Sequence, residues 1–387
     1  MATTWSSPLH AAAAVAPATG PAAPSSAAPA SIARPELKAL TSLRFLAALM
    51  VFMDHAPVTE WASHHLGFGA AGVGFFFLLS GFVLMYSHGT DFAAGIRWPQ
   101  VRKFYVARFA RIYPAYLVAL LTMTLALAAL GKLRLAEAVP VFFAQMFLVQ
   151  SWIHNELVYE GLNFVGWSIS VEAFFYLLFP ISALLIWRLS KHPRGIAIAA
   201  GVVLLTLAAV VTHIGPAYIK WSYVLPVVRF PEFFLGMLLA IAFFSAAKSG
   251  GTLREINVFL LAAVCVVLSP FAPYGLRLAA WMIPALAALL FTFATQRGAI
   301  SNFLTAPAFV RLGEISFAFY LVHPLALLLV TDFTRSPLGI SIGGLALALG
   351  LSFLMYGVVE RPMRKRIVAA LAVRPPQPAT AAVPAPR

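Results

Sequence analysis

Ten long stretches of predominantly apolar residues dominate this chain of 387 residues. Each has close to the roughly 20 residues that an α-helix needs to cross the hydrocarbon core of a bilayer. The ten stretches cover residues 39–57, 67–87, 112–130, 165–187, 196–214, 229–247, 255–272, 277–295, 312–331 and 338–359. Only 10% of all residues are charged, whereas an average soluble domain carries about 25%. The chain is therefore predicted to be an all-α integral membrane protein, which excludes a soluble enzyme, a disordered protein and a nucleic-acid-binding module.

The positions of the basic residues predict how the chain crosses the membrane. If all ten stretches cross and the N-terminus is inside, 20 of the 27 Lys and Arg residues lie on the cytoplasmic side and 5 on the outer side. Cytoplasmic loops carry such an excess of Lys and Arg. A shorter apolar stretch, 138–152, would remove this bias if it also crossed. It is therefore expected to be re-entrant or interfacial, with about ten transmembrane helices and both termini cytoplasmic.

The ends of the chain differ from its middle in composition. Residues 1–33 are almost all Ala, Pro, Ser, Thr and Gly, which cannot bury enough apolar surface to fold. Residues 367–387 are similarly rich in Ala and Pro. Both segments are expected to be flexible tails around one membrane domain of residues 34–366. The one cysteine, Cys265, excludes an internal disulfide and a cysteine-built metal site, and no metal site is expected.

Arg44 and His55 are candidate functional groups because charged and titratable side chains inside a bilayer are costly. They lie 11 residues apart on the first stretch, so on a helix they share one face about 16 Å apart along the axis. Histidine can act as a general base near neutral pH, and arginine keeps its positive charge. This face suits acyl transfer to an alcohol and equally suits a proton-coupled transporter. The structural alternatives are snorkelling of Arg44 and an interfacial position for His55.

The second stretch contains GVGFFFLLSGF, residues 72–82. Its glycines permit close approach of helices, and Ser80 can hydrogen-bond across a helix interface. Core packing alone explains this pattern. The functional interpretation is a wall of a substrate path, lined by Ser80, Gly81 and Phe82.

Five basic residues crowd the segment 97–111, before the third stretch. Arg108 and Arg111 are spaced i, i+3 on a helix that is expected to end near Tyr113 and Pro114, so they present one cationic edge. Such an edge suits anionic lipid headgroups and equally suits the phosphates of a nucleotide cofactor.

The fourth stretch begins with GWSISVEAFFYLLFP, residues 166–180. A carboxylate buried there, that of Glu172, must be paired or protonated, and Arg44, Arg229 or a histidine could pair with it. Trp167 suits the outer aromatic belt of a membrane protein. Ser170 and Glu172 fall on different parts of the helix surface, so only some of these polar groups can face one pocket.

Two further pairs of polar residues lie in apolar stretches. Arg229 and Glu232 are spaced i, i+3, which predicts an ion pair between them. Glu314 and His323 lie nine residues apart, on opposite sides of one straight helix. His323 precedes a proline, which frees backbone groups, so a structural hydrogen bond and a catalytic role both remain open for it.

Together these blocks resemble the bacterial membrane acyltransferase-3 family. Arg44, ten intervening residues and His55 match the Arg-x10-His signature of that family. GVGFFFLLSGF, RFARIYP, WSISVEAFFYLLFP, FAFYLVHP and VERP match further blocks in the same order, and the resemblance covers roughly residues 36–366. One departure is Ala173, where many relatives carry a bulky or acidic residue after the glutamate.

The resemblance implies a ten-helix membrane enzyme that uses cytoplasmic acyl-CoA, with acetyl as the expected acyl group. It implies His55 as the essential catalytic residue and Arg44 as its companion, and Glu172 is the candidate partner of Arg44. The RFARIYP block is expected to hold the CoA phosphates through Arg108, Arg111 and Tyr113. The residues expected to line the substrate path are Ser80, Gly81, Phe82, Trp167, Ser170 and His323.

The predicted function is transfer of an acyl group from acyl-CoA to a hydroxyl of a cell-surface glycan or related sugar-containing acceptor. His55 would act as general base, and the expected location is the bacterial inner membrane. The expected partners are the acceptor, membrane lipid and glycan-assembly proteins, with no nucleic acid. The alternative is a proton-coupled transporter that uses the same intramembrane ionisable residues, and it has no need of a basic cofactor segment.

Overall fold

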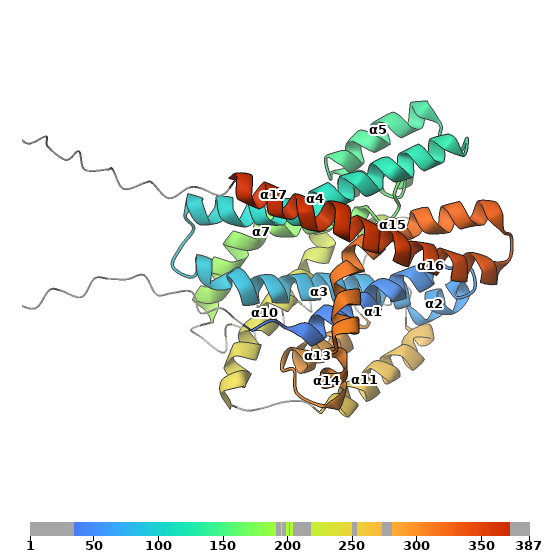
Figure 1. Ribbon diagram of the computed structural model, residues 1–387. Coiled ribbons are helices and arrows are strands. Elements are labelled where there is room, and N and C mark those ends of the chain that lie inside the picture. The colour runs from blue at the N-terminus through green and yellow to red at the C-terminus, as the bar shows by residue number, and fades with distance from the viewer. Residues whose placement is uncertain are drawn as a thin grey trace, which may run out of the picture. The chain divides into compact units, whose positions relative to one another are not determined.

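The computed structural model describes residues 35–190, 195, 199–200, 202–203, 218–249, 254–272 and 281–371. Every regular element in these residues is helical, which confirms the predicted all-α class. The chain divides into a unit of Met1–Glu36 and a unit of Leu37–Arg387, and all the helices below belong to the second unit (Figure 1). The two expected tails lie mostly outside the described residues, and so does most of the predicted span 196–214.

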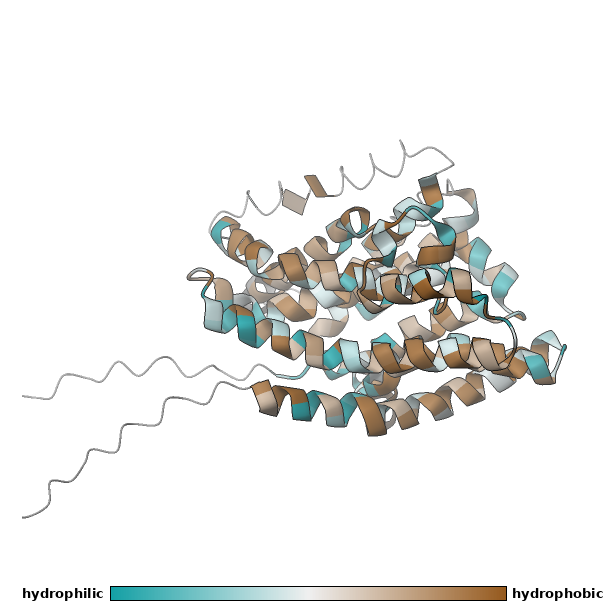
Figure 2. Ribbon diagram, turned by 90° about the horizontal axis from the view of Figure 1, so that it is seen from above, coloured by the Kyte–Doolittle hydropathy of each residue, from teal (hydrophilic) through white to brown (hydrophobic). Residues whose placement is uncertain are grey.

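Long apolar helices make up most of the described structure. Six of them are long and apolar enough to cross a membrane: Phe68–Phe92 (α3 with η1), Trp98–Ala129 (α4), Trp167–Leu189 (α7), Pro226–Phe244 in α10 (Pro226–Ser249), Pro307–Phe333 (α15), and Pro337–Leu371 (α16, η5 and α17). A seventh candidate joins α1 (Lys38–His55) to α2 (Glu60–Leu66), with a bend of 118° between them. Figure 2 shows hydrophobic colour along these helices and more hydrophilic colour toward many of their ends. The chain is therefore a multi-pass membrane protein, while the number ten stays a prediction.

Shorter elements connect the long helices. They are α5 (Leu135–Met146), η2 (Gln150–Trp152), α6 (Glu156–Tyr159), α9 (Ile219–Val224), α11 (Glu255–Leu268), η4 (Ser269–Phe271), α13 (Ile283–Ala294) and α14 (Ala299–Leu304). With 12 residues, α5 is about 18 Å long, and the hydrocarbon core is about 30 Å thick. This length agrees with the expectation that the stretch 138–152 does not cross.

The third predicted span begins earlier than expected. Helix α4 starts at Trp98 and runs through Pro114 without a break, so Arg108 and Arg111 lie within a helix of 32 residues and not in a loop before it. The expectation that the helix ends near Tyr113 and Pro114 is therefore wrong. Proline removes only one backbone donor from a helix, and long membrane helices tolerate it where neighbouring groups compensate.

Helix α1 packs against both α3 and α15. Close approach is possible because glycines stand at the contacts. A Cβ atom at Gly313 of α15 would fall on the backbone carbonyl of Thr41, and one at Gly72 of α3 would crowd the carbonyl of Ala47. Arg44 and His55 therefore lie on a helix that is held between two other long helices.

The segment between α5 and α7 is tied down by buried amides. The Gln150 Nε2 donates to the Gly166 carbonyl at 2.8 Å and the Asn163 side chain donates to the Leu321 carbonyl of α15 at 3.2 Å. The Tyr116 hydroxyl of α4 donates to the Gln145 carbonyl at 2.9 Å. With the bond from the Gln150 Nε2 to the Tyr116 hydroxyl at 3.3 Å, they fix the segment against α4 and α15. Phe164, the residue after Asn163, then lies against the end of α1.

Candidate functional site

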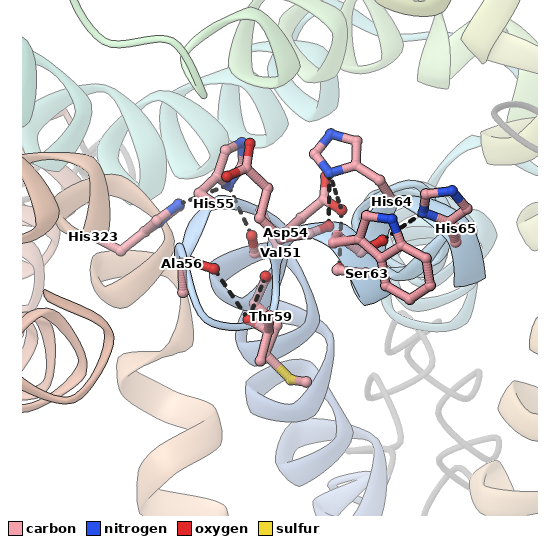
Figure 3. Close-up of polar contacts among 12 residues, drawn as sticks. Val51, Asp54, His55, Ala56, Thr59, Ser63, His64, His65 and His323 are labelled. Atoms are coloured by element: carbon pink, nitrogen blue, oxygen red, sulfur yellow. Dashed lines mark hydrogen bonds and ion pairs between the residues drawn. The ribbon is translucent and has the colours of Figure 1, made fainter. Parts of the chain in front are cut away.

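The site is built around the end of α1. His55 is the last residue of that helix, and the chain bends immediately after it into α2. Its imidazole points toward His323 of α15, as Figure 3 shows. The two histidines, called the histidine pair below, come from helices whose contact is set by the glycine at position 313. Packing of α1 on α15 therefore brings together two groups that are 268 residues apart in sequence.

Each histidine of the pair is bonded to a backbone carbonyl through Nδ1. The Nδ1 of His55 lies 2.8 Å from the carbonyl oxygen of Val51, and the Nδ1 of His323 lies 2.8 Å from that of Tyr320. A carbonyl oxygen only accepts hydrogen bonds, so both neutral imidazoles carry their proton on Nδ1. The Nε2 of His323 is then unprotonated and can accept a hydrogen bond. It lies 3.4 Å from the Nδ1 of His55, which carries a proton.

The opposite nitrogen of His55, Nε2, is consequently unprotonated in the neutral ring. No residue in the described parts of the chain forms a hydrogen bond to it. The ring of Phe164 lies 4.7 Å from the imidazole between centroids, and that of His323 lies at 5.4 Å. These neighbours fix the plane of the His55 ring, so its available lone pair has a defined direction, as a general base requires.

Asp54 interacts electrostatically with His55, but its hydrogen bond and ion pair are with other groups of the described chain. Its carboxylate accepts a hydrogen bond from the Ser63 hydroxyl at 2.9 Å and lies 3.9 Å from the His64 ring (Figure 3). The Thr59 hydroxyl donates to the Met53 carbonyl at 2.6 Å. These contacts join α2 back to the last turn of α1 and hold the bend beside His55.

Arg44 lies in a second polar group, nearer the other end of α1. This arginine cluster combines residues from α1, α4, α7, η5 (Tyr356–Glu360) and α17 (Arg361–Leu371). Its members, which interact electrostatically with one another, are Arg44, Arg108, Arg111, Glu172, Tyr176, Glu360 and Arg364. Helix α17 runs alongside α4 (Figure 1). Four guanidinium groups face two carboxylates, so the cluster is cationic when all are charged.

Glu172 is held inside this cluster by two hydroxyl groups. Its Oε1 accepts hydrogen bonds from Ser80 at 3.0 Å and from Tyr176 at 2.6 Å. The expected proximity of Glu172 to Arg44 is found as an electrostatic interaction. The Nε–H of Arg108 is buried and has no hydrogen-bond partner among the described residues, although its guanidinium lies over the Phe104 ring. The cluster therefore keeps a donor available.

Three members of the cluster were not singled out from the sequence as site residues. They are Tyr176, Arg364 and Glu360, the last of which is only 7% exposed. Glu360 belongs to the VERP block and closes a π-helical turn, η5. Turns of this type occur frequently at functional sites. The VERP block was thus a usable signal, but nothing local indicates that it folds back onto α4.

The other residues expected at the substrate path have separate surroundings. A Cβ atom at Gly81 would fall on the Phe233 carbonyl, and Phe82 is fully buried, so both pack in the interface of α3 with α10. Ser170 donates to the Leu148 carbonyl at 2.6 Å. These contacts match the packing alternative.

Two aromatic residues of the predicted site make contacts within the protein. Trp167 is 7% exposed and packs 5.0 Å from the Tyr223 ring, so it is covered by α9 and does not stand in an exposed aromatic belt. Tyr113 donates to the Met146 carbonyl at 3.1 Å and thereby joins α4 to α5. Within the described residues, no group of three or more His, Cys, Asp or Glu side chains could hold a metal ion.

Comparison with known proteins identifies the family. A family model described as an acyltransferase domain matches residues 37–357. The chain belongs to this acyltransferase family. It is a membrane-bound O-acyltransferase, as the sequence predicted, and the family match favours this activity over the transporter alternative.

Three relatives give the range of the similarity. The chain is 31% identical to the acyltransferase MdmB of Streptomyces mycarofaciens, over 89% of this chain and 96% of that one. It is 30% identical to nodulation protein 10 of Rhizobium leguminosarum bv. viciae, over 41% of this chain and 47% of that one. It is 25% identical to the peptidoglycan O-acetyltransferase OatA of Listeria monocytogenes, over 42% of this chain and 26% of that one. No solved structure matches the chain.

Proposed function

We propose that this acyltransferase moves an acyl group, acetyl in the simplest case, from acyl-CoA to a hydroxyl of a sugar-containing acceptor, with His55 as general base. The observation that carries the proposal is the unprotonated and unbonded Nε2 of His55. Its tautomer is set by the Val51 carbonyl. A hydroxyl nucleophile needs such a base, because an alcohol is a weak nucleophile while it keeps its proton.

The arginine cluster supports the choice of acyl-CoA as donor. CoA carries several phosphate groups, and arginine binds phosphate through charge-assisted and often bidentate hydrogen bonds. Arg44, Arg108 and Arg111 lie in one cluster, and the buried Nε–H of Arg108 lacks a partner among the described residues. These donors fit an anionic ligand, and the carboxylates of Glu172 and Glu360 offset part of the repulsion among the arginines.

The positions of the two groups along α1 support transfer between the two sides of the membrane. Arg44 and His55 lie 11 residues apart on a single helix, which is about 16 Å along its axis. The excess of Lys and Arg favours a cytoplasmic position for the arginine cluster, where acyl-CoA is made, and a position for His55 toward the outer side. The thioester would extend from the cluster toward His55.

The proposed reaction balances without a further reactant. The His55 Nε2 takes the proton of the acceptor hydroxyl as its oxygen forms a bond to the thioester carbonyl carbon. The carbon–sulfur bond then breaks, and the proton on Nε2 passes to the leaving thiolate. His55 returns to its neutral state, and the products are the acyl ester and the free CoA thiol. While His55 is charged, its Nδ1–H stays bonded to the Val51 carbonyl.

The acceptor class rests on the relatives. One of them is named a peptidoglycan O-acetyltransferase, which makes a glycan or another sugar-containing molecule the natural acceptor to test. The test compares surface glycans and secreted sugar-containing products, by mass spectrometry, from cells with and without the gene. Purified protein in nanodiscs is then given acetyl-CoA and the molecule that lost its acyl group. Acyl-CoA-dependent ester formation is expected, and solute transport without ester formation would contradict the proposal.

A further inference from the structure

A buried ion pair lies outside both groups used so far. Arg229 and Glu232 stand on α10, where they are 0% and 1% exposed, and the Arg229 Nη2 lies 3.1 Å from the Glu232 Oε2. This confirms the ion pair that their spacing predicted. Burying two charges in a protein interior is expensive unless further hydrogen bonds satisfy both groups.

The ion pair leaves the hydrogen-bonding groups of both side chains without partners. Within the described part of the chain, none of the three guanidinium nitrogens of Arg229 and neither carboxylate oxygen of Glu232 has a hydrogen-bond partner. The contact between them is close, but it is not aligned as a hydrogen bond. Buried polar atoms in native proteins nearly always have partners, and exceptions call for a water, an ion or a ligand. The pair thus offers donors and acceptors to a third group.

Beside the Glu232 carboxylate there is room for one methyl group. A Cβ atom at Gly74 of α3 would find its nearest neighbours, the Leu286 Cδ1 and the Glu232 Oε2, at 3.6 and 3.9 Å. The buried backbone of α3 therefore leaves room for a group of methyl size next to Glu232. Glycines that mediate helix packing in this protein, such as Gly81, have no such space.

Aromatic rings form the walls around the guanidinium. The Arg229 guanidinium carbon lies 5.2 Å from the centroid of the Phe77 ring and 4.8 Å from that of Tyr223. Trp167 packs on both rings, at 6.2 and 5.0 Å between centroids. The guanidinium lies over both rings, and such cation–π contacts hold it in place without using its N–H donors.

The charges decide what chemistry fits. An anion would be repelled by Glu232 and a cation by Arg229. A neutral hydroxyl can accept from the guanidinium and donate to the carboxylate at the same time. We propose that Arg229, Glu232 and the space at Gly74 form a subsite for a hydroxyl of the acceptor sugar. This inference rests on the proposed function, because it assumes a sugar-containing acceptor.

The subsite is linked to the histidine pair by contacts through Tyr320. The Tyr320 ring lies 6.0 Å from that of His323, and its hydroxyl lies 2.8 Å from the Ser168 hydroxyl, next to Trp167 in the chain. Tyr223 and Tyr320 interact electrostatically. Tyr223 and Tyr320 therefore connect the subsite to His323. An acceptor held at Arg229 and Glu232 would approach the histidine pair from the side on which Tyr320 lies.

The test fills the space and leaves the charges in place. Gly74→Ala is compared with Gly350→Ala, which makes the same change in α16 where a Cβ atom would meet nothing within 4 Å. Both proteins are supplied with [14C]acetyl-CoA and with membranes of a strain that lacks the gene, which contain the unacylated acceptor. The readout is the ratio of label transferred to acceptor to label released as free acetate by hydrolysis.

We expect this ratio to fall at least about tenfold in Gly74→Ala, the effect of losing a hydrogen bond to a charged group, and to stay at the wild-type value in Gly350→Ala. If Gly74→Ala is folded and its ratio is unchanged, the space holds only water and the subsite is refuted. Where Gly74→Ala does not fold, the same ratio is measured for Glu232→Gln. A fall of at least about tenfold supports the subsite, and an unchanged ratio refutes it. If the wild-type protein neither transfers nor hydrolyses acetyl-CoA, the proposed function itself fails, which is a distinct result.

Discussion

The Nε2 of His323 faces the Nδ1–H of His55 at 3.4 Å, and the Nδ1–H of His323 is in turn bonded to the Tyr320 carbonyl. The second histidine therefore stands where many hydrolases and transferases place an acidic residue that orients the base. It is fully buried, and its lone pair can only accept. We infer that His323 is a positioning residue for His55.

Substitution of His323 tests this relationship. His323→Leu keeps the bulk of the side chain but removes the acceptor, so kcat is expected to fall about 10- to 100-fold, the cost of one hydrogen bond to a charged group. The KM values for both substrates should change little. His323→Gln, whose amide oxygen can accept from the His55 Nδ1–H, should recover part of the loss. Equal defects in the two variants, in a steady-state kinetic comparison, would indicate a purely structural role.

His55 itself should be indispensable for transfer. His55→Ala removes the base, and general base catalysis is typically worth about 10²- to 10⁴-fold in rate. His55→Gln should be as inactive, because an amide cannot take a proton. Both proteins are expected to insert and to unfold near the wild-type temperature, because position 55 ends a helix. Release of CoA thiol in the presence of acceptor is the measurement, and wild-type rates in either variant would remove His55 from the mechanism.

Much of this site could be predicted from local spacing. Arg44 and His55 share one helix face because 11 residues make about three turns, and Arg229 with Glu232 pairs because i, i+3 residues are neighbours on any helix. Periodicity within one helix says nothing about which helices meet. Local spacing therefore could not predict that His55 contacts His323, since the contact depends on glycine-mediated packing of α1 on α15.

The arginine cluster shows the same limit. The basic residues of α4 predict an anion-binding edge, but the cluster also needs Glu360, which a π-helical turn and the return of α17 along α4 bring in. The continuation of α4 through Pro114 was missed for a different reason. Proline is a helix breaker in water, whereas a bilayer offers the chain no better alternative than to stay helical.

Removal of two arginines of the cluster should mainly weaken the binding of acyl-CoA. Arg108→Ala combined with Arg111→Ala deletes two charged donors, and at about 1.5 kcal/mol or more for each such hydrogen bond the KM for acyl-CoA should rise at least about 100-fold. The KM for the acceptor should change much less. The matched control is Lys103→Ala, which removes an exposed charge from the same helix. A lower kcat at an unchanged KM for acyl-CoA would contradict the docking role.

A substitution at Gly81 distinguishes helix packing from substrate contact, the two roles that the sequence GVGFFFLLSGF allows. A Cβ atom at this position would fall on the Phe233 carbonyl, which belongs to the backbone of α10 and cannot rotate away. Gly81→Ala should therefore push α3 away from α10 and lower the free energy of unfolding by about 1–3 kcal/mol, the usual range for overpacking a core. Gly350→Ala, which meets open space, should be neutral. Thermal unfolding in detergent measures both changes. If Gly81→Ala instead keeps its stability and raises the KM for the acceptor, residue 81 lines the substrate path after all.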